Sequence, residues 1–337
     1  MKIKSCIYLI VFLFLISSCS VPIEDSDPLS SWNDGKTKSS IIEFVNDVTN
    51  QNSPDYIKVQ ERIAVFDNDG TLWTEKPIYF QIQFVIDRVK EMAKDHPEWK
   101  EKQPYKAVIE NDIKTLMSSG SDAIGELFVV SHTGMSTAEF YNIGSDWINK
   151  AKHPKFDKPF TDLIFQPMLE LMEYLRENGF KTYIVSGGGQ TFIRLFAEEV
   201  YEIPPQQVIG TLFETEYKMI DGKPEILRLP EVLLIDDKDI KPVAIEKFIG
   251  RIPTMAFGNS DGDLQMLQYT QSGKGKRLMG LVHHTDAERE YAYDRDSHIG
   301  HLDKAWDEAI ENNWIMIDMK NDWKVIYPFE LVLKENM

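Results

Sequence analysis

The sequence predicts an α/β protein with a parallel central sheet and a mostly helical cap inserted after the first motif strand. Short apolar runs at 62–66 (RIAVF), 181–185 (KTYIV) and 252–257 (IPTMAF) end in small or acidic residues, and helical stretches precede the second and third. Strands that alternate with helices indicate a parallel sheet with crossover connections. Residues 76–164 have helical periodicity and no convincing strand, which predicts the inserted cap.

The N-terminal residues 1–18 predict a signal peptide. Lys2 and Lys4 precede an apolar run, IYLIVFLFLI, that is too short to span a bilayer comfortably. Ile16-Ser17-Ser18-Cys19 follows and resembles the bacterial lipobox, in which signal peptidase cuts before a cysteine that then carries lipid. We therefore expect a lipid anchor at Cys19, which would hold the protein at a membrane of the bacterial cell envelope, outside the cytoplasm. The alternative is an ordinary secretory signal with a cysteine there by chance.

The cysteine count and the charge exclude several classes of function. The chain has two cysteines, Cys6 and Cys19, so the processed body would have neither a disulfide nor a thiol nucleophile. Loss of Lys2 and Lys4 leaves 35 basic against 54 acidic side chains, a formal charge of −19. We expect no nucleic-acid partner for so acidic a body, and any anionic substrate must be held by a local site.

The chain divides into a leader, a tether, a core and a cap. Residues 19–35 are polar and contain two prolines, which is typical of a tether. A helical pattern begins at Lys36, so we assign 36–75 and 165–337 to the α/β core and 76–164 to the helical cap. The part after Leu281 is polar and is expected to be helical, with 314–319 as a last strand.

The stretch AVFDNDGTLW at 64–73 holds two aspartates directly after a buried strand. Two like charges so close repel each other unless a cation or a shared reaction holds them. The alternative is a plain polar turn, since Asp and Gly are common turn formers. The other two strands also end in polar motifs, however, and in a parallel sheet the ligand site lies outside the carboxyl ends of the strands.

This first motif can carry phosphoryl transfer. A carboxylate can attack a phosphoryl group and form a covalent intermediate, and Asp67 at the strand end is the expected nucleophile. Asp69 could protonate the leaving oxygen and then deprotonate the attacking water. The Thr71 hydroxyl and the neighbouring backbone amides could bind phosphoryl oxygens.

The second and third motifs supply a phosphate site and a cation. Ser186 and Gly187 offer a hydroxyl and exposed amides that open onto a helix start, where anions are favoured. A flexible loop is the alternative reading of this glycine-rich stretch. We expect Lys241 to balance the charge of the phosphate, with Lys238 and Lys247 as rivals.

The fourth motif, GNSDGDLQML, is rich in oxygen donors: Asn259, Asp261 and Asp263. Hard oxygen ligands of this kind suit Mg²⁺, which keeps waters and bridges to substrate phosphate. A simple turn is again the alternative for each residue alone.

Together, the four motifs resemble those of the haloacid dehalogenase superfamily of phosphohydrolases, and especially its phosphoserine-phosphatase-like branch. The resemblance implies a Rossmann-like core and Mg²⁺-dependent hydrolysis of small phosphorylated metabolites through an aspartyl-phosphate. It also implies catalytic roles for Asp67, Asp69 and Lys241. The metal would be held by the Asp67 side chain, the Asp69 backbone carbonyl and the fourth motif, for which we name Asn259 and Asp263.

The chain also departs from the family pattern. The fourth motif often begins Gly-Asp, whereas this chain has Asn259, and Glu75 stands one residue short of the glutamate that binds the substrate amine in phosphoserine phosphatases. The substrate therefore stays open, as do a phosphotransferase, a phosphonate hydrolase and a non-catalytic ligand-binding lipoprotein. His132 could contact substrate, but we expect a surface or core role for it, and a structural or substrate-edge role for the pair His283-His284.

Overall fold

The computed structural model describes residues 27–331, apart from the side chains of residues 117 and 121. The predicted signal peptide (1–18), Cys19 and the first part of the predicted tether lie outside these residues. Within 27–331, no helix is long and apolar enough to cross a membrane.

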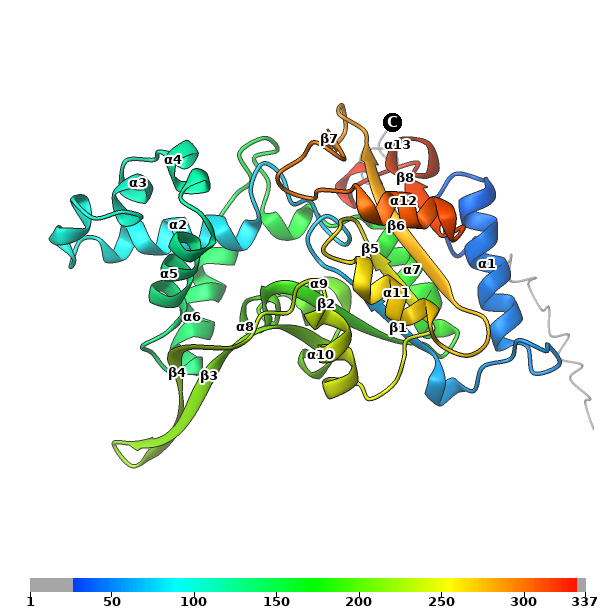
Figure 1. The fold of residues 1–337 in the computed structure, drawn as a ribbon, viewed down its shortest axis with the longest axis horizontal. Coiled ribbons are helices and arrows are strands. Elements are labelled where there is room, and N and C mark those ends of the chain that lie inside the picture. Colours follow the sequence, from blue (N-terminus) through cyan, green and yellow to red (C-terminus); the bar gives the residue numbers. More distant parts are fainter. Residues whose placement is uncertain (1–26, 332–337) are drawn as a thin grey trace, which may run out of the picture.

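A mostly parallel sheet forms the centre of the molecule (Figure 1). Its strands are β1 (Ile63–Phe66), β2 (Lys181–Gly189), β3 (Val208–Ile220), β4 (Lys223–Leu234), β5 (Met255–Gly258), β6 (Leu278–Thr285), β7 (Ala292–Tyr293) and β8 (Ile315–Asp318). Their order is β4-β3-β2-β1-β5-β6-β7, with β8 paired to β6. Only the β3–β4 and β6–β7 pairs among these strands are antiparallel. The predicted α/β class with a parallel sheet is confirmed.

Helices cover both faces of the sheet. These helices are α1 (Lys36–Thr49), α7 (Gln166–Glu177), α8 (Gln190–Ile193), α9 (Ala197–Tyr201), α10 (Ile240–Phe248), α11 (Leu264–Gln271), α12 (Lys304–Glu311) and α13 (Met319–Asp322). In β1, Ala64 and Phe66 join the apolar cluster of α1 and α7, whereas Ile63 and Val65 join that of α10, α11 and α12. Alternate side chains of β1 thus pack into two hydrophobic cores on opposite faces of the sheet, which is why its sequence is apolar throughout.

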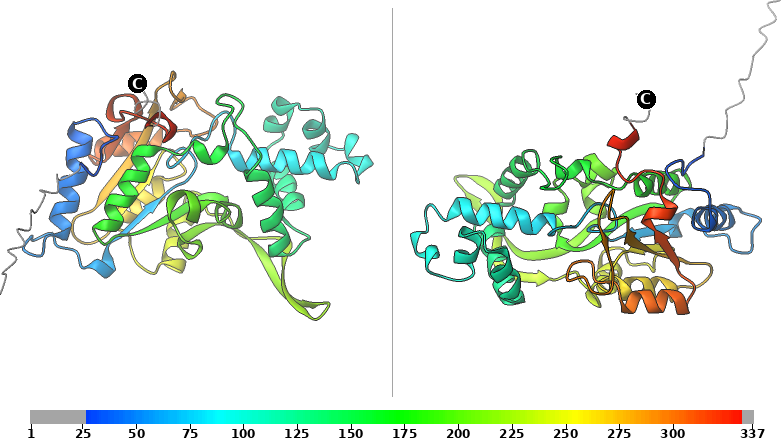
Figure 2. Two further views of the ribbon diagram at one scale, coloured as in Figure 1. Left: turned by 180° about the vertical axis from the view of Figure 1, so that it is seen from behind. Right: turned by 90° about the horizontal axis from the view of Figure 1, so that it is seen from above.

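The inserted segment folds into five α-helices and two short 3₁₀ helices, Pro97–Lys100 and Phe160–Asp162, at one end of the molecule (Figures 1 and 2). The α-helices are α2 (Phe80–Met92), α3 (Tyr105–Ile109), α4 (Ile113–Ser118), α5 (Ser121–His132) and α6 (Thr137–Ile148). Ser136 and Glu139 form a capping box that starts α6. The ring of Phe84 on α2 lies between those of Phe140 and Trp147, so aromatic packing holds the cap together.

A long hairpin, β3–β4, reaches from the core to the cap (Figure 1). Its turn residues Asp221 and Gly222 both have positive φ, 50° and 78°, as a type I′ turn requires. The Gly134 amide donates to the Arg228 carbonyl, and the Arg228 amide donates to the Met135 carbonyl. The hairpin is not among the predicted elements, although Asp-Gly between alternating apolar residues is a recognisable hairpin signal.

Two further expectations differ from the structure. Residues 27–35 fall within the predicted tether, but Leu29 and Trp32 are fully buried and Trp32 packs edge-on against Trp323. This part therefore belongs to the folded core. The polar part after Leu281 is helical mainly in α12. Strand β6 continues through Thr285, and mostly irregular chain connects it to α12. The expected last strand is present as β8.

Candidate active site

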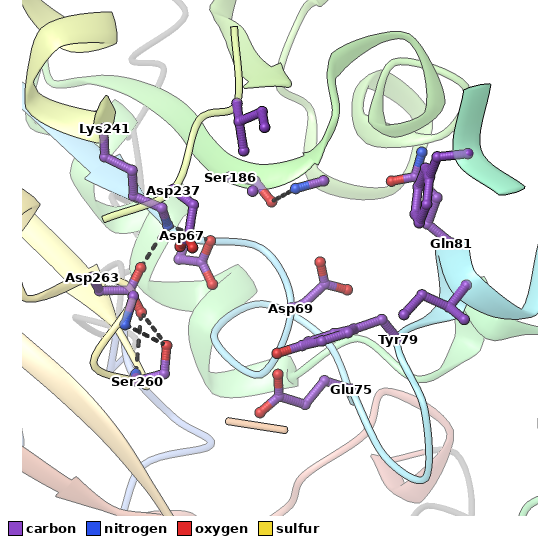
Figure 3. Close-up of a pocket in the computed structure, with 16 residues that line it drawn as sticks. Asp67, Asp69, Glu75, Tyr79, Gln81, Ser186, Asp237, Lys241, Ser260 and Asp263 are labelled. Carbon is purple, nitrogen blue, oxygen red and sulfur yellow. Dashed lines mark hydrogen bonds and ion pairs between the residues drawn. The ribbon is translucent and has the colours of Figure 1, made fainter. Parts of the chain in front are cut away.

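The motifs meet at the carboxyl ends of β1, β2 and β5, around a cavity of about 280 Å³ (Figure 3). Of the predicted site residues, six line this cavity: Asp67, Asp69, Ser186, Gly187, Lys241 and Asp263. Thr71 and Asn259 are buried and do not line the cavity.

Lys241 is the lysine that enters the site. It stands in the first turn of α10, is 2% exposed, and its Nζ donates to Asp67 Oδ1 at 2.7 Å and to Asp263 Oδ1 at 2.6 Å. Burial alone would lower the pKa of Lys241, but the nearby carboxylates, Asp263 first, outweigh it and raise the pKa. Its rivals Lys238 and Lys247 are exposed.

The two aspartates of the first motif face the cavity in different environments. Burial and the charge of Asp263 raise the pKa of Asp67, which Lys241 opposes. Burial raises the pKa of Asp69 to about 6, although Trp73 Nε1 donates to its Oδ1 at 2.8 Å. A carboxyl whose pKa lies near neutrality can both give and take a proton at physiological pH.

Asp263 holds the fourth-motif loop and Lys241 together. Its Oδ1 accepts from Lys241, and its Oδ2 accepts from the amides of Asn259 at 3.0 Å and Ser260 at 3.1 Å. A Cβ on Gly258 would lie 2.4 Å from the Asp263 Cβ, so this close approach requires glycine. Both Asp263 oxygens thus accept hydrogen bonds from the protein, so a direct metal bond to Asp263, which stays a prediction, would have to compete with these contacts.

Asp261 turns away from the site. Its Oδ1 accepts from the amides of Asp303 and Ala305, both at 2.9 Å, at the start of α12. Asp261 thereby satisfies free N–H groups of that helix. Of the fourth-motif side chains, Ser260 and Asp263 line the cavity, whereas Asn259 is buried beside Thr71 and Glu75.

Thr71 is placed differently from the expectation. It is fully buried, and its Oγ1 donates to Asn259 Oδ1 at 3.3 Å. The hydroxyl is thus used inside the protein, so the predicted phosphate contact of Thr71 is not supported.

Ser186 and Gly187, which are predicted to bind phosphate, line one side of the cavity. Strand β2 continues through the glycines, and the Gly188 amide donates to Ser186 Oγ at 3.1 Å. A Cβ on Gly210 of β3 would lie 2.6 Å from the Gly188 carbonyl oxygen, so this turn packs tightly on the next strand. The Gly189 amide donates to Gln81 Oε1 at 2.7 Å, and Ser186, Gly187 and Gly188 line the cavity.

Comparison with known proteins identifies the chain. Residues 64–268 match the haloacid dehalogenase-like hydrolases. The chain belongs to this family. No curated protein sequence matches this hydrolase.

Several solved structures are similar to this chain. A protein of unknown function from Bordetella pertussis Tohama I has a TM-score of 0.50 and 13% identity over 77% of this chain and 99% of its own. A functionally unknown protein from Anaerococcus prevotii DSM 20548 has a TM-score of 0.49 and 16% identity, covering 86% and 94%. A phosphoserine phosphohydrolase-like protein from Francisella tularensis subsp. tularensis SCHU S4 has a TM-score of 0.40 and 17% identity, covering 82% and 100%. At 13% identity, the similarity to the Bordetella pertussis protein concerns the fold alone.

The cap of this hydrolase adds residues that the sequence analysis did not assign. Tyr79, Gln81, Ile82 and Phe128 line the cavity. Gln81 Nε2 lies 2.9 Å from His132 Nε2, so His132 supports Gln81 from behind. Periodicity alone would not have found these residues, because Gln81 and Tyr79 stand out only once α2 is oriented over the sheet.

His132 and His284 have structural positions. Burial and then the charge of Arg228 lower the pKa of His132 to about 3, so its ring is neutral. His284 Nε2 donates to the Gly70 carbonyl at 2.8 Å, and its Nδ1 lies 3.1 Å from Glu290 Oε2. His284 thus supports the backbone beside Asp69, in agreement with the structural role expected for it.

The donor set of the site fits a magnesium ion. In the described chain, no three His, Cys, Asp or Glu side chains converge to hold a metal by themselves. Mg²⁺ needs fewer, since it binds through one or two carboxylates, waters and substrate phosphate. Asp67, the Asp69 carbonyl and Asn259 Oδ1 are oxygen donors of the kind that Mg²⁺ takes. Burial raises the pKa values of Asp67, Asp69 and Glu75 around a single buried lysine, and such an excess of acid favours a cation.

Proposed function

We propose that this hydrolase is a magnesium-dependent phosphatase that cleaves small phosphomonoesters through an aspartyl-phosphate. The observation that carries the proposal is the triad in which Lys241 joins Asp67 to Asp263, with Asp69 and Ser186 facing the same cavity. The cavity volume of about 280 Å³ suits a small phosphorylated metabolite.

The residues divide the reaction between them. Asp67, oriented by Lys241, attacks phosphorus, and the bond from phosphorus to the ester oxygen breaks as Asp69 protonates that oxygen. Asp69 then takes a proton from water, which attacks the phosphorus of the aspartyl-phosphate and regenerates Asp67. Ser186 and the Gly187 amide bind the non-bridging oxygens. When bound, Mg²⁺ would be held by Asp67, the Asp69 carbonyl and Asn259, and would offset the charge of the phosphoryl group.

A panel of phosphorylated metabolites, scored by phosphate release with Mg²⁺ and with EDTA, tests this function. We expect Mg²⁺-dependent release from at least one small phosphomonoester. Asp67→Asn should abolish it while leaving the fold intact, because an amide of nearly the same shape cannot form an acyl-phosphate. Substantial turnover by pure Asp67→Asn protein would refute the nucleophile assignment.

The same assay separates the alternative reactions. With an alcohol acceptor present, a phosphotransferase would yield a new phosphate ester in place of free phosphate. A phosphonate hydrolase would release phosphate from carbon–phosphorus substrates and leave esters intact. A ligand-binding lipoprotein would bind phosphorylated compounds without turnover.

We further propose that the enzyme is a lipoprotein of the bacterial cell envelope, anchored through Cys19 and outside the cytoplasm. The support is the lipobox-like segment Ile16–Cys19 behind a short apolar run. Stable anchoring takes more than one acyl chain, which multiple acylation of this cysteine would supply. Cys19→Ser protein should leave the membrane fraction of a bacterial host. Continued fractionation with membranes would contradict a lipid anchor at this residue.

A further inference from the structure

A buried chain of hydrogen bonds runs from Tyr293 to the catalytic loop through Glu75. The Tyr293 hydroxyl and Asn259 Nδ2 both donate to Glu75 Oε1, each at 2.8 Å. Thr71 Oγ1 donates to the other end of the Asn259 amide, Oδ1, at 3.3 Å. Glu75 is 2% exposed and Asn259 is 1% exposed, so water cannot replace these partners freely.

The surroundings are shaped around this contact. A Cβ on Gly70 would lie 2.0 Å from Asn259 Nδ2 and 2.6 Å from Glu75 Oε1. A Cβ on Gly300 would lie 2.0 Å from the same Glu75 oxygen. Both glycines have positive φ, 74° and 65°, so neither position suits another residue. Two glycines distant in sequence thus make room for one acceptor oxygen.

This contact sets the direction of the Asn259 amide. The amide has a nitrogen that only donates and an oxygen that only accepts, in nearly the same shape. Glu75 Oε1 accepts from Asn259 Nδ2, so the opposite orientation would bring two oxygens together. The Asn259 oxygen is therefore directed to the Thr71 side of the loop, and oxygen is the atom that can ligate a hard cation. An aspartate at this position, with two equivalent oxygens, would not need such orientation.

The geometry points to Glu75 as a positioning residue for the metal site: it holds the amide of Asn259 so that its oxygen faces the cation. Residue 259 is an asparagine where the family often has an aspartate. The nearby carboxyl group belongs to Glu75, which acts on the metal site by orienting Asn259. This inference rests on the proposed function, because it assumes that a cation binds at Asp67.

Calorimetric titration of the metal-free protein with MgCl₂, without substrate, tests the role. Glu75→Leu keeps much of the volume but removes the acceptor, and should weaken Mg²⁺ binding by about 10- to 100-fold, the usual effect of losing a group that orients a ligand. Glu75→Gln is the matched control, because it loses the charge but keeps an acceptor oxygen for Asn259. Its Mg²⁺ affinity should stay close to that of the wild type.

An exchange of the pair gives a second, independent measurement. Asn259→Asp alone places two carboxyl groups in a buried 2.8 Å contact and should lower the unfolding temperature of the metal-free protein. Adding Glu75→Gln restores a donor opposite an acceptor, so the double variant should recover most of that loss. This arm needs neither metal nor turnover, and it stays informative if Glu75→Leu does not fold.

The outcomes separate this inference from the proposed function. Equal weakening by Glu75→Gln and Glu75→Leu would show that the charge matters and would overturn the positioning role. Unchanged Mg²⁺ affinity in Glu75→Leu, or no recovery in the double variant, would also overturn it. A wild-type protein that does not bind Mg²⁺ would overturn the metal in the proposed function, and the role of Glu75 toward that metal with it.

Discussion

Replacing Lys241 with methionine should destabilise the folded protein strongly, because it leaves two buried carboxylates without their cation. The Asp67 side chain is 10% exposed and that of Asp263 is 1% exposed, and Lys241 donates to them at 2.7 and 2.6 Å. Methionine keeps the length and most of the volume of the lysine stem, so the effect reports charge and hydrogen bonding more than packing. Removing one partner of a buried ion pair costs about 3–5 kcal/mol in the free energy of unfolding.

The assay is urea unfolding of EDTA-treated protein near neutral pH, followed by tryptophan fluorescence. Lys247→Met, on the exposed side of the same helix, is the matched control and should stay within about 0.5 kcal/mol of the wild type. Lys241→Met combined with Asp263→Asn should cost less than the sum of the single changes, since the two residues share one interaction. The deficit of Lys241→Met should also shrink in acid, where carboxyl groups lose their charge. A loss of under about 1 kcal/mol in the unfolding free energy of Lys241→Met would refute the reasoning, because removing one partner of a buried ion pair should destabilise the protein by more than that.

Two further predictions concern titrating groups. Asp69→Asn keeps the backbone carbonyl but removes the proton donor, so kcat should fall much more for alkyl than for aryl phosphates; an equal loss for both would contradict the acid role. His132 is buried, and its pKa is lowered from 6.5 to about 3. As pH falls from 6.5 toward 3, the ring gains a proton in the unfolded chain but not in the folded protein, so the free energy of unfolding decreases over that range and is unaffected above it. Between pH 7 and pH 5 the wild type should therefore lose about 2 kcal/mol more unfolding free energy than His132→Gln; parallel urea-midpoint profiles for the two proteins would show that His132 is not buried in its neutral form.

The sequence alone was sufficient for the parallel strands β1, β2 and β5 and for the chemical character of their carboxyl ends. The run at 62–66 is apolar on both faces, and its helical neighbours repeat along the chain, so β1 and the parallel connections follow from local pattern. Asp67, Asp69 and Ser186 stand at strand ends, and parallel topology brings strand ends together whatever the details of packing. These predictions depend on neighbours in the chain, which the sequence displays directly.

The tertiary structure decided which polar atoms face the cavity and which are used inside the protein. Asn259 meets Glu75 across 184 residues, and Asp261, two residues on, turns outward to the start of α12. The Thr71 hydroxyl donates to Asn259. Of the three candidate lysines, it is Lys241 that donates to Asp67. Composition could not foresee this, because every residue of an Asn-, Ser-, Asp- and Gly-rich loop can serve as ligand, cap or turn former. The choice depends on which donors and acceptors from distant segments are packed against each atom, since buried polar groups must find partners.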